Sequence, residues 1–393
     1  MADALSLGAT SDLPPSHFSG IPKGYARTRE VCAHTGHMAS SWARGRCMER
    51  IAALDDARLE SHEFRGAVLR EIAGFIGHDA WVWPLADPIT TVGISPMANT
   101  PCPQELPLLI TLKYSTTLNR WTSLPVNPAR ALSLAAVSAG ELSRSESWAR
   151  VLRRYAITDV LSLVFADRWG IWGWLDLWRG DGAGTFTEQE AEELSALAPV
   201  ITTGLRHCSA RQFQMASTVG VPNHDQAVLA LANDLGIISQ TGSATRWLDL
   251  LQPGPHPHHG IPAEVLNVAA QLLAVEHGVD AHSASSLVHV GEGVWARLSA
   301  TRMTTPFDHG MAPIAVTIQD ALPSERIEVF ERCFALSPGE CQLLELAATG
   351  LDTAALAHAL GIGRYTVQDQ FKSLFGKCAV QSRSALVAMA CGR

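Results

Sequence analysis

The sequence predicts a multidomain α+β protein, in which two mixed α+β domains precede an all-α domain of four helices. Three observations predict this architecture. The chain of 393 residues is long enough for two or three domains with separate cores. Apolar runs joined by short turns, typical of β-hairpins, occur in both halves of the region before residue 322. The C-terminal segment contains short helical patterns with recognisable start and stop residues.

The composition limits the possible classes of protein. Hydrophobic residues make up 47% of the chain and charged residues 17%, which is typical of a globular rather than a disordered protein. The net charge of −8 argues against a surface that binds a polyanion everywhere, so nucleic-acid contact would need a local patch. No apolar stretch approaches the ~20 residues that cross a bilayer, and no secretory signal is recognisable. Eight cysteines without a C-x-x-C spacing indicate reduced thiols. We expect a soluble, cytoplasmic protein without membrane contact.

The first domain is expected at residues 46–212, after a flexible leader at 1–45 that lacks apolar periodicity. Apolar residues at three-to-four spacing from Met48 onward predict one amphipathic helix or a pair of helices. A strand at 79–85 and a loop to about Gln104 follow. The next pattern is a further helical stretch at Leu106–Tyr114.

A β-hairpin provides the clearest strand signal of this domain. The apolar runs Val160–Ala166 and Ile171–Arg179 are joined by a short polar link that contains glycine. Both faces of the second run are apolar, which predicts a central strand covered on both sides. Thr187 and Glu190 then form a capping box that starts a long helix to about His207.

Aromatic residues cluster on the second strand of this hairpin. Because side chains alternate along a strand, Trp172, Trp174, Asp176 and Trp178 are expected on one face of the sheet. An aromatic sheet face with one polar group is typical of a pocket for a small apolar ligand. A packed hydrophobic core is the alternative interpretation of the same residues.

The second α+β domain is expected at residues 221–322. Its pattern is a hairpin, two helices and then three strands, an order typical of a small antiparallel sensor sheet. The corresponding segments are 227–232 and 237–240 for the hairpin, 243–251 and 263–275 for the helices, and 286–290, 294–300 and 314–319 for the strands. A linker at 323–334 follows.

Residues 335–393 contain the most specific pattern. Ser337-Pro338-Gly339-Glu340 starts a helix, and Asp352 caps a second short one. The turn Gly361-Ile362-Gly363 precedes a third helix from Arg364 to about Phe375, and a fourth helix covers 384–390. Two short helices joined by a glycine turn describe a helix-turn-helix, whose second helix can enter the major groove of DNA.

The same segment resembles the LuxR/FixJ-type DNA-binding domain over residues 336–388. The similar residues are Leu336-Ser337-Pro338, Glu340, Ala347, Gly350, Leu356-Ala357, Leu360-Gly361-Ile362, Thr366-Val367, Lys377, Val380 and Ser382-Arg383. The resemblance implies that the helix with Thr366-Val367 is the recognition helix and that the last helix serves as a dimer contact. The whole order of domains resembles actinobacterial LuxR-type regulators with a GAF-like and then a PAS-like sensor domain. It implies a homodimeric transcription regulator whose partners are double-stranded DNA, RNA polymerase and an unknown small-molecule ligand.

Helical periodicity assigns roles on the recognition helix. Arg364, Gln368 and Lys372 share the face opposite the apolar stripe. Arg364 and Gln368 lie early enough to reach base edges, while Lys372 suits a phosphate. Thr366 would contact a phosphate or cap the helix. Lys377 and Arg383 are also expected at phosphates, and for Arg383 binding to carbonyl groups at a helix end is an equal alternative.

The segment also departs from the family pattern. Ala354 and Gln368 stand where the family prefers lysine, and Ala379 stands where it prefers glycine. From Leu336 to Arg393 the chain has five basic and four acidic residues, a net charge of +1. A single copy is therefore expected to bind DNA weakly, and a dimer would double the contacts. The alternative function is a sensor or adaptor protein whose helix-turn-helix no longer binds DNA and serves protein–protein contact.

Other candidate sites fit no known chemistry. Cys32, His34, His37 and Cys47 match no common zinc spacing, and His256, His258 and His259 lie in a proline-rich loop, so no metal site is expected. The sequence lacks G-x-S-x-G, P-loop, G-x-G-x-x-G and H-E-x-x-H patterns. We therefore expect neither catalysis nor a cofactor.

Overall fold

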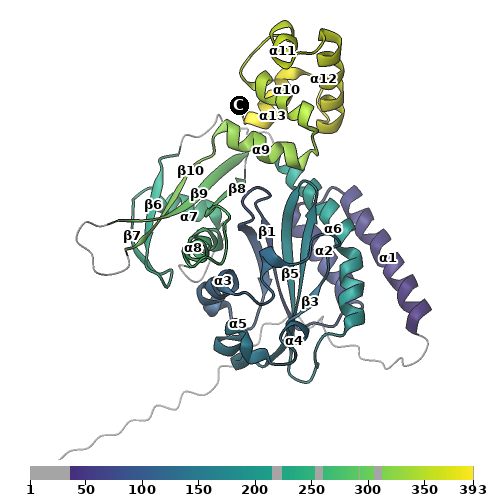
Figure 1. The fold of residues 1–393 in the computed structure, drawn as a ribbon, viewed down its shortest axis with the longest axis vertical. Helices are drawn as coiled ribbons and strands as arrows, with labels where there is room; N and C mark the ends of the chain where they lie inside the picture. Colours follow the sequence, from purple (N-terminus) through teal and green to yellow (C-terminus); the bar gives the residue numbers. More distant parts are fainter. Residues whose placement is uncertain (1–35, 215–223, 253–259, 292, 305–311, 393) are drawn as a thin grey trace, which may run out of the picture. The chain divides into compact units, whose positions relative to one another are not determined.

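The computed structural model describes residues 36–214, 224–252, 260–291, 293–304 and 312–392 (Figure 1). These residues form two five-stranded antiparallel sheets and a C-terminal group of helices, which confirms a mixed α+β architecture. Across the described ranges, no helix has both the length and the apolar content required to span a membrane.

The first sheet has the strand order β2-β1-β5-β4-β3. Its strands are β1 (Ala80–Ala86), β2 (Gly93–Asn99), β3 (Leu132–Ser133), β4 (Ile157–Asp167) and β5 (Gly170–Gly180). The predicted hairpin is confirmed as β4 and β5, and β5 is the central strand. Strand β2 was wrongly predicted as loop. It is an edge strand with a largely exposed side, where Pro96 is tolerated because one row of N–H groups faces no partner strand.

One face of the first sheet packs against α1 (Gly36–Asp56), α2 (Ser61–Ala73) and α6 (Glu188–Gln214). Figure 1 shows α6 running along this sheet. The predicted capping box is present, since Glu190 N donates to Thr187 Oγ1 and Thr187 N donates to Glu190 Oε2. Gly204 lets α2 approach α6 closely, because a Cβ at this position would lie 2.2 Å from the ring of Phe64.

The other face of the first sheet is covered by shorter elements. They are η1 (Pro103–Glu105), α3 (Leu106–Ser115), η2 (Trp121–Ser123), α4 (Leu134–Val137), η3 (Leu142–Arg144), α5 (Glu146–Arg150) and η4 (Leu152–Tyr155). This sheet with its covering elements is called the first lobe below. Its short covering helices fill the face less completely than long helices do, and a cavity described below remains there.

The second sheet has the order β7-β6-β10-β9-β8, which is the same 2-1-5-4-3 arrangement when each sheet is numbered separately. Its elements are β6 (Ala227–Leu231), β7 (Ile237–Gln240), α7 (Ala244–Leu251), α8 (Ala263–Glu276), β8 (Ser285–Gly291), β9 (Val294–Arg302) and β10 (Ile314–Asp320). The predicted order of strands and helices is confirmed. These elements are called the second lobe below.

Helix α8 packs on the second sheet and also contacts the first lobe. A polar line on α8 faces strand β2: Glu264 accepts a hydrogen bond from Ser95 N at 3.0 Å, and Asn267 donates to Gly93 O at 2.8 Å. Both side chains are buried. Because Glu264 and Asn267 are one helical turn apart, they bind the edge of β2 from the same face of α8.

The segment predicted as a linker is helix α9 (Pro323–Cys333), and it is packed rather than extended. Phe330 on α9 and Trp295 on β9 both pack against Phe213 near the end of α6, with ring centroids at 5.3 and 4.5 Å. The buried Arg326 side chain donates to Gly293 O at 3.0 Å and to the carbonyls of Met389 and Ala390 at longer distances. Helix α9 therefore joins α6, the second lobe and the C-terminal helices.

The C-terminal helices are α10 (Pro338–Ala348), α11 (Thr353–Leu360), α12 (Arg364–Cys378) and α13 (Arg383–Cys391). They confirm the four predicted helices, with α12 longer than expected by one turn. The Ser337–Glu340 capping box and the Asp352 cap are both present. Gly361 ends α11 with φ of +64°, a conformation that glycine adopts without strain.

Candidate functional site

The helix-turn-helix presents one side of α12 to solvent. Val367, Phe371 and Leu374 are buried against the other C-terminal helices. Arg364, Thr366, Gln368 and Lys372, four of the predicted DNA-contacting residues, are exposed. The turn places α12 directly after α11, which is the arrangement that lets the second helix of the pair enter a major groove.

The same side of α12 contains two residues that the role assignment omitted. Tyr365 follows Arg364 and is 84% exposed, the highest value among the large hydrophobic side chains described. Asp369 accepts a hydrogen bond from Lys372 Nζ at 3.2 Å, and both side chains are largely exposed. Nothing in the sequence around Tyr365 and Asp369 marks them as functional. They are identified as outward-facing because they lie opposite the buried side of α12.

Lys377 and Arg383 bind within the domain. Lys377 Nζ donates to Glu340 Oε2 at 2.6 Å and to Ala335 O at 3.1 Å. Arg383 donates to Ala347 O at 3.1 Å, near the end of α10, and lies 5.7 Å from the ring centroid of Phe371. Arg383 thus binds a carbonyl group at a helix end, which was the alternative to a phosphate contact. Arg364, Lys372 and Lys377 are the exposed basic residues of α12, and of these Lys372 and Lys377 are paired with carboxylates.

Glu340 anchors this internal network. Burial alone raises the pKa of its carboxyl, but hydrogen bonds from Lys377, from Ser337 N and from Ser373 outweigh burial and lower the pKa to about 2. The carboxylate therefore stays ionised near neutral pH and holds α10 against α12. The sequence indicated Glu340 only as part of the capping box and did not predict its contacts with α12.

The tryptophan residues of β5 do not all share one face, which corrects a prediction. Trp174, Asp176 and Trp178 face the short helices, whereas Trp172 packs in the core on the α6 face and donates to Asp167 Oδ1 at 3.0 Å. The register of β4 and β5 shifts between Phe165 and Ala166, where a β-bulge reverses the alternation of side chains. Strict alternation fails at Trp172 for this reason.

The face with Trp174, Asp176 and Trp178 borders a cavity of about 80 Å³, called the sheet cavity below. Asp176 and Trp178 line it, while Trp174 does not. Trp174 stacks on Trp121, with ring centroids 5.4 Å apart and planes at 8°, and Trp121 lines the cavity in its place. The remaining lining is mainly aliphatic, from Val82, Leu106, Leu109, Ile110, Leu118, Leu134, Leu152 and Val160.

An ion pair closes one wall of the sheet cavity. Lys113 Nζ lies 3.0 Å from Asp176 Oδ2, and Trp121 Nε1 donates to Asp176 Oδ1 at 3.1 Å. Sequence reasoning found Asp176 but missed Lys113 and Trp121. Both lie more than fifty positions before Asp176 in the chain, and no local pattern connects them to it.

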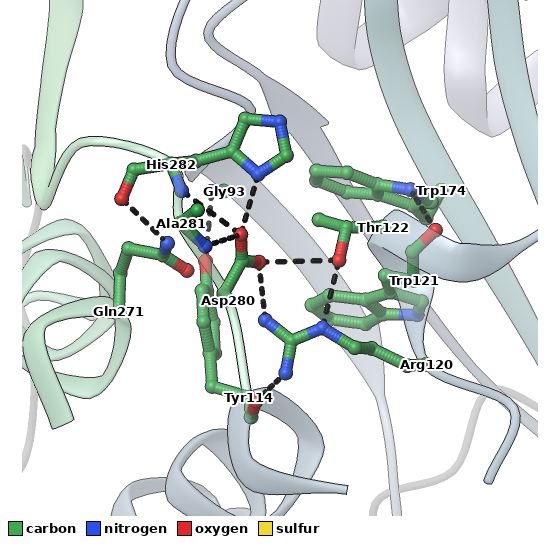
Figure 2. Close-up of polar contacts among 10 residues, drawn as sticks. All are labelled: Gly93, Tyr114, Arg120, Trp121, Thr122, Trp174, Gln271, Asp280, Ala281 and His282. Atoms are coloured by element: carbon green, nitrogen blue, oxygen red, sulfur yellow. Dashed lines mark hydrogen bonds and ion pairs between the residues drawn. The ribbon is translucent and has the colours of Figure 1, made fainter. Parts of the chain in front are cut away.

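Trp121 also adjoins a second polar group, called the interlobe cluster below (Figure 2). Arg120 Nε donates to Thr122 Oγ1 at 2.7 Å, and the guanidinium also binds Tyr114 O and the carboxylate of Asp280. Asp280 belongs to the second lobe and accepts hydrogen bonds from Ala281 N and His282 N. The Arg120–Asp280 pair is almost fully buried, with 5% of each side chain exposed.

The pKa of Asp280 reflects this pairing. Burial alone raises it, but hydrogen bonds from His282 and the Arg120 guanidinium outweigh burial and hold the pKa well below its usual range. Figure 2 shows Asp280 between Arg120 and His282, with Gln271 of α8 beside His282. The cluster thus ties the loop that borders the sheet cavity to the second lobe.

The metal candidates do not form a site among the described residues. Cys47 is a buried core residue of α1, and burial raises the pKa of its thiol to about 11. Cys32, His34, His256, His258 and His259, together with the side chain of His37, lie outside the described residues. In the described ranges no three His, Cys, Asp or Glu side chains come close enough to hold a metal ion.

Comparisons with known proteins bear mainly on the C-terminal segment. Over 51 residues the chain is 49% identical to a protein of Aeromonas salmonicida named as an HTH-type transcriptional regulator in the exeN 3′ region. This stretch is 13% of the chain and 26% of that relative, so the chain spans about a quarter of it. A solved structure, the E. coli DhaR(N)–DhaL complex, aligns over 74% of this chain and 91% of that one. The TM-score of 0.20 and 12% identity establish no common fold.

Residues 335–390 match the family model described as bacterial regulatory proteins, luxR family. The match covers the four helices whose caps and buried stripe are described above. The C-terminal segment of this chain is a LuxR-family helix-turn-helix domain.

Proposed function

We propose that this protein is a DNA-binding transcription regulator that acts as a homodimer. The observation that carries the proposal is the exposed side of α12, with Arg364 and Lys372, in a segment that matches the luxR family. An exposed second helix in this motif is the element that reads the major groove.

Different residues of α12 are proposed to contact the bases and the phosphates. Arg364 and Gln368 are proposed to contact base edges, since arginine pairs well with guanine and glutamine with adenine. Lys372 and Thr366 are proposed to contact phosphates. Lys377, bound to Glu340, is proposed to position α12 against α10 instead of contacting DNA directly.

Dimerisation is proposed because one copy offers few charges to the DNA. Lys377 and Arg383 are hydrogen-bonded to groups of their own domain and Lys372 is paired with Asp369, so each copy offers few unpaired cations to phosphates. Two linked copies double the contacts and fix the spacing of two half-sites. RNA polymerase is the proposed protein partner of the bound dimer.

The two lobes are proposed to be the GAF-like and PAS-like sensor domains of this regulator. Support comes from two antiparallel sheets of matching strand order and from the sheet cavity in the first lobe. A ligand shifts the protein between states only through different affinities for them. The proposed route runs through Trp121 and the interlobe cluster to the second lobe and then through α9 to the helix-turn-helix.

The test measures DNA binding directly. Full-length protein is titrated against labelled duplex from the region upstream of its own gene, followed by fluorescence anisotropy. Arg364→Ala is expected to weaken binding by roughly 10-fold or more, because a bidentate base contact is lost. Lys372→Ala is expected to reduce the salt dependence by about one unit of the log–log slope. Arg150→Ala is the matched control, since it removes an exposed cation from α5 in the first lobe.

The second candidate function is an adaptor whose helix-turn-helix binds protein. The pairing of Lys372 with Asp369, of Lys377 with Glu340 and of Arg383 with Ala347 O favours it. A salt series separates the two functions. A DNA binder loses affinity steeply as salt rises. If wild type and both α12 variants bind duplex equally weakly at all salt concentrations, the adaptor function replaces the regulator function.

A further inference from the structure

The outermost side of α12 is defined by the residues that lie directly opposite its buried ones. The buried residues of this helix are Val367, Phe371, Leu374 and Cys378. At about 100° per residue, the opposite positions, called the outer line below, are Tyr365, Asp369, Lys372 and Gly376, and all four are exposed. Arg364 and Gln368 are also exposed but lie toward one flank. A helix that enters a groove with its buried side outward places the outer line deepest.

Tyr365 lies in the first turn of α12 and is 84% exposed. An aromatic ring has a large apolar area, which gains free energy when a partner covers it. In a helix-turn-helix, the first residues of the second helix contact base edges in the major groove. The apolar group that bases present there is the methyl group of thymine. The ring of Tyr365 is therefore placed to pack against a thymine methyl.

Asp369 lies one turn after Tyr365 on the outer line. Its side chain is 73% exposed, and its ion pair with Lys372 is an i,i+3 contact at 3.2 Å. Exposed pairs of this kind add little stability, so the fold does not account for the carboxylate. On a surface that meets DNA, a carboxylate is repelled by phosphates unless a base donates to it. Cytosine offers its N4 amino group as a donor, whereas guanine and thymine present acceptors and adenine places the acceptor N7 beside its amino group.

Gly376 occupies the same line near the end of α12. Its backbone is helical, and a Cβ there would meet no atom of the described chain within 4 Å. Neither packing nor backbone conformation requires glycine, which is less favourable than alanine in a helix. Glycine also serves where another backbone approaches closely. Eleven residues span about 16 Å of helix, more than the ~12 Å width of the major groove, so Gly376 reaches the sugar–phosphate wall when Tyr365 contacts bases.

We infer that Tyr365 and Asp369 are base-reading residues of α12, and that the DNA site of each copy contains a thymine read by Tyr365 and a cytosine read by Asp369. The inference rests on the DNA-binding function proposed above and adds to the contacts assigned there to Arg364 and Gln368. Four helical residues rise about 6 Å and base pairs stack about 3.4 Å apart, so the two bases lie within about two steps. Lys372 orients the carboxylate and offsets its charge toward the phosphates.

The main test is selection of preferred sequences from a pool of random duplexes by the full-length protein. Wild type is expected to select cytosine at one position of each half-site, by about tenfold over other bases. Asp369→Asn replaces the anion by an amide, which pairs with N6 and N7 of adenine, so the preference at that position is expected to change from cytosine to adenine. Asp181→Asn, the same substitution in the exposed β5–α6 turn, is the matched control. An unchanged cytosine preference in Asp369→Asn overturns the inference.

Asp369→Ala separates base reading from a role in folding. On the selected duplex it is expected to bind about tenfold more weakly than wild type. On a duplex without the motif it is expected to bind about twofold or more tightly, because the repulsion of phosphates is removed and Lys372 becomes available to them. A residue that acted only through folding would weaken both complexes. Equal weakening on the two duplexes therefore contradicts the inference.

Uracil, which lacks only the methyl group of thymine, tests Tyr365. Replacing each thymine near the selected cytosine by uracil is expected to weaken wild-type binding about fourfold at one position, the effect of one buried methyl group. Tyr365→Ala is expected to bind the thymine and uracil duplexes equally. If Tyr365→Ala keeps the preference for thymine, another residue reads the methyl group and the role of Tyr365 is wrong.

Gly376→Ala tests the close approach of the outer line to DNA. The added methyl group is expected to weaken binding of the selected duplex at least about threefold, because it occupies space needed at the groove wall. Gly45→Ala in α1 is the matched control, since a Cβ there also meets no described atom within 4 Å. Wild-type affinity in Gly376→Ala would show that the outer line does not face the DNA.

The same selection separates this inference from the proposed function. If wild type enriches no motif and binds no duplex, the regulator function fails and the inference fails with it. If wild type enriches a motif that neither Asp369→Asn nor Tyr365→Ala alters, the regulator function stands and the inference alone is overturned.

Discussion

The sheet cavity and the interlobe cluster lie on two sides of the same short segment, and they treat polar groups differently. In the interlobe cluster, Arg120 and Asp280 are buried and each makes several hydrogen bonds. In the sheet cavity, Trp178 Nε1 and Asn119 Oδ1 are equally buried and make none. Both regions combine aromatic and charged residues, so residue types alone do not distinguish them.

This difference in hydrogen bonding separates buried polar groups that stabilise the fold from those that do not. A buried group with its partners within the chain is needed for stability, and removing it leaves the partner unpaired. A buried group without partners gains no hydrogen bond in the folded protein, so removing it leaves no partner unpaired.

Asp280→Ala is expected to have the largest effect. It leaves the Arg120 guanidinium buried without its counter-ion, and removal of one partner of a buried pair costs about 3–5 kcal/mol of unfolding free energy. Chemical denaturation of the full chain measures it, with Asp181→Ala in the exposed β5–α6 turn as control. An unfolding free energy within about 0.5 kcal/mol of wild type would show that the pair is not structural.

The contribution of the Arg120–Asp280 pair to stability changes with pH in a definite direction. The pKa of Asp280 is lower in the folded protein than in the unfolded chain, so the unfolded chain binds more protons in acid. The stabilisation is therefore complete above the ordinary aspartate pKa of about 4 and is lost as the pH falls below it. The Asp280→Ala variant should lose this part of the acid dependence of unfolding.

Glu340→Gln tests the corresponding paired group in the helix-turn-helix. It weakens the contacts to Lys377 and Ser373, and hydrogen bonds to charged groups contribute about 1.5–3 kcal/mol. The exposed Glu192→Gln on α6 is the control. Because the folded pKa of Glu340 is about 2, its stabilisation is lost as the pH falls from about 4.5 toward 2. A variant with the same acid unfolding profile as wild type contradicts this role.

Glu331 on α9 lies outside the cavity, and its pKa shift has the opposite direction. Burial, with the nearby Glu345 carboxylate, raises its pKa to about 7, and its Oε1 atom has no partner. The folded protein binds the extra proton, so stability falls as the pH rises from about 4.5 through 7. Glu331→Gln is expected to raise the Tm at pH 8 by about 1–2 °C and to change it little at pH 5. A lower Tm at pH 8 would mean that the carboxylate is needed.

The smallest difference compares two tryptophans of β5. Trp174 Nε1 donates to Trp121 O at 3.0 Å, so Trp174→Phe is expected to cost about 1 kcal/mol beyond the change in packing. Trp178→Phe removes a donor with no partner, so the empty protein is expected to lose only the packing contribution. Thermal unfolding of both variants without ligand measures the difference. Greater destabilisation by Trp178→Phe would reveal a structural partner for its Nε1 group.

Local patterns predicted much of the fold. The β4–β5 hairpin, the Thr187–Glu190 and Ser337–Glu340 capping boxes and the buried side of α12 depend on residues close together in the chain. Their signals are turn residues, caps and periodicity, which act over a few residues. For the same reason α12 could be located and the exposure of Arg364, Gln368 and Lys372 predicted, although Tyr365 and Asp369 were missed.

Other features depend on neighbours that are distant in the sequence. The bulge near Phe165 moves Trp172 to the α6 face, although the local sequence still alternates. Strand β2 is held by pairing with β1 and by contacts from α8, because its own residues have weak strand character. Helix α9 contains Pro323 and several charged residues typical of a linker, but its one aromatic side chain, Phe330, packs against Phe213.

Local patterns predicted the hairpins of two α+β domains and a C-terminal helix-turn-helix, because caps, turns and periodic apolar residues act over a few positions. The LuxR type was predicted from the resemblance to that family. The antiparallel pairing of the whole first sheet and the pairing of the polar groups depend on tertiary contacts. The tertiary structure brings Lys113 to Asp176 and Arg120 to Asp280, but no side-chain partner to Trp178 Nε1 or Asn119 Oδ1. Hydrogen bonds need atoms within about 3 Å, and the distances between residues remote in the chain are set only when the lobes pack.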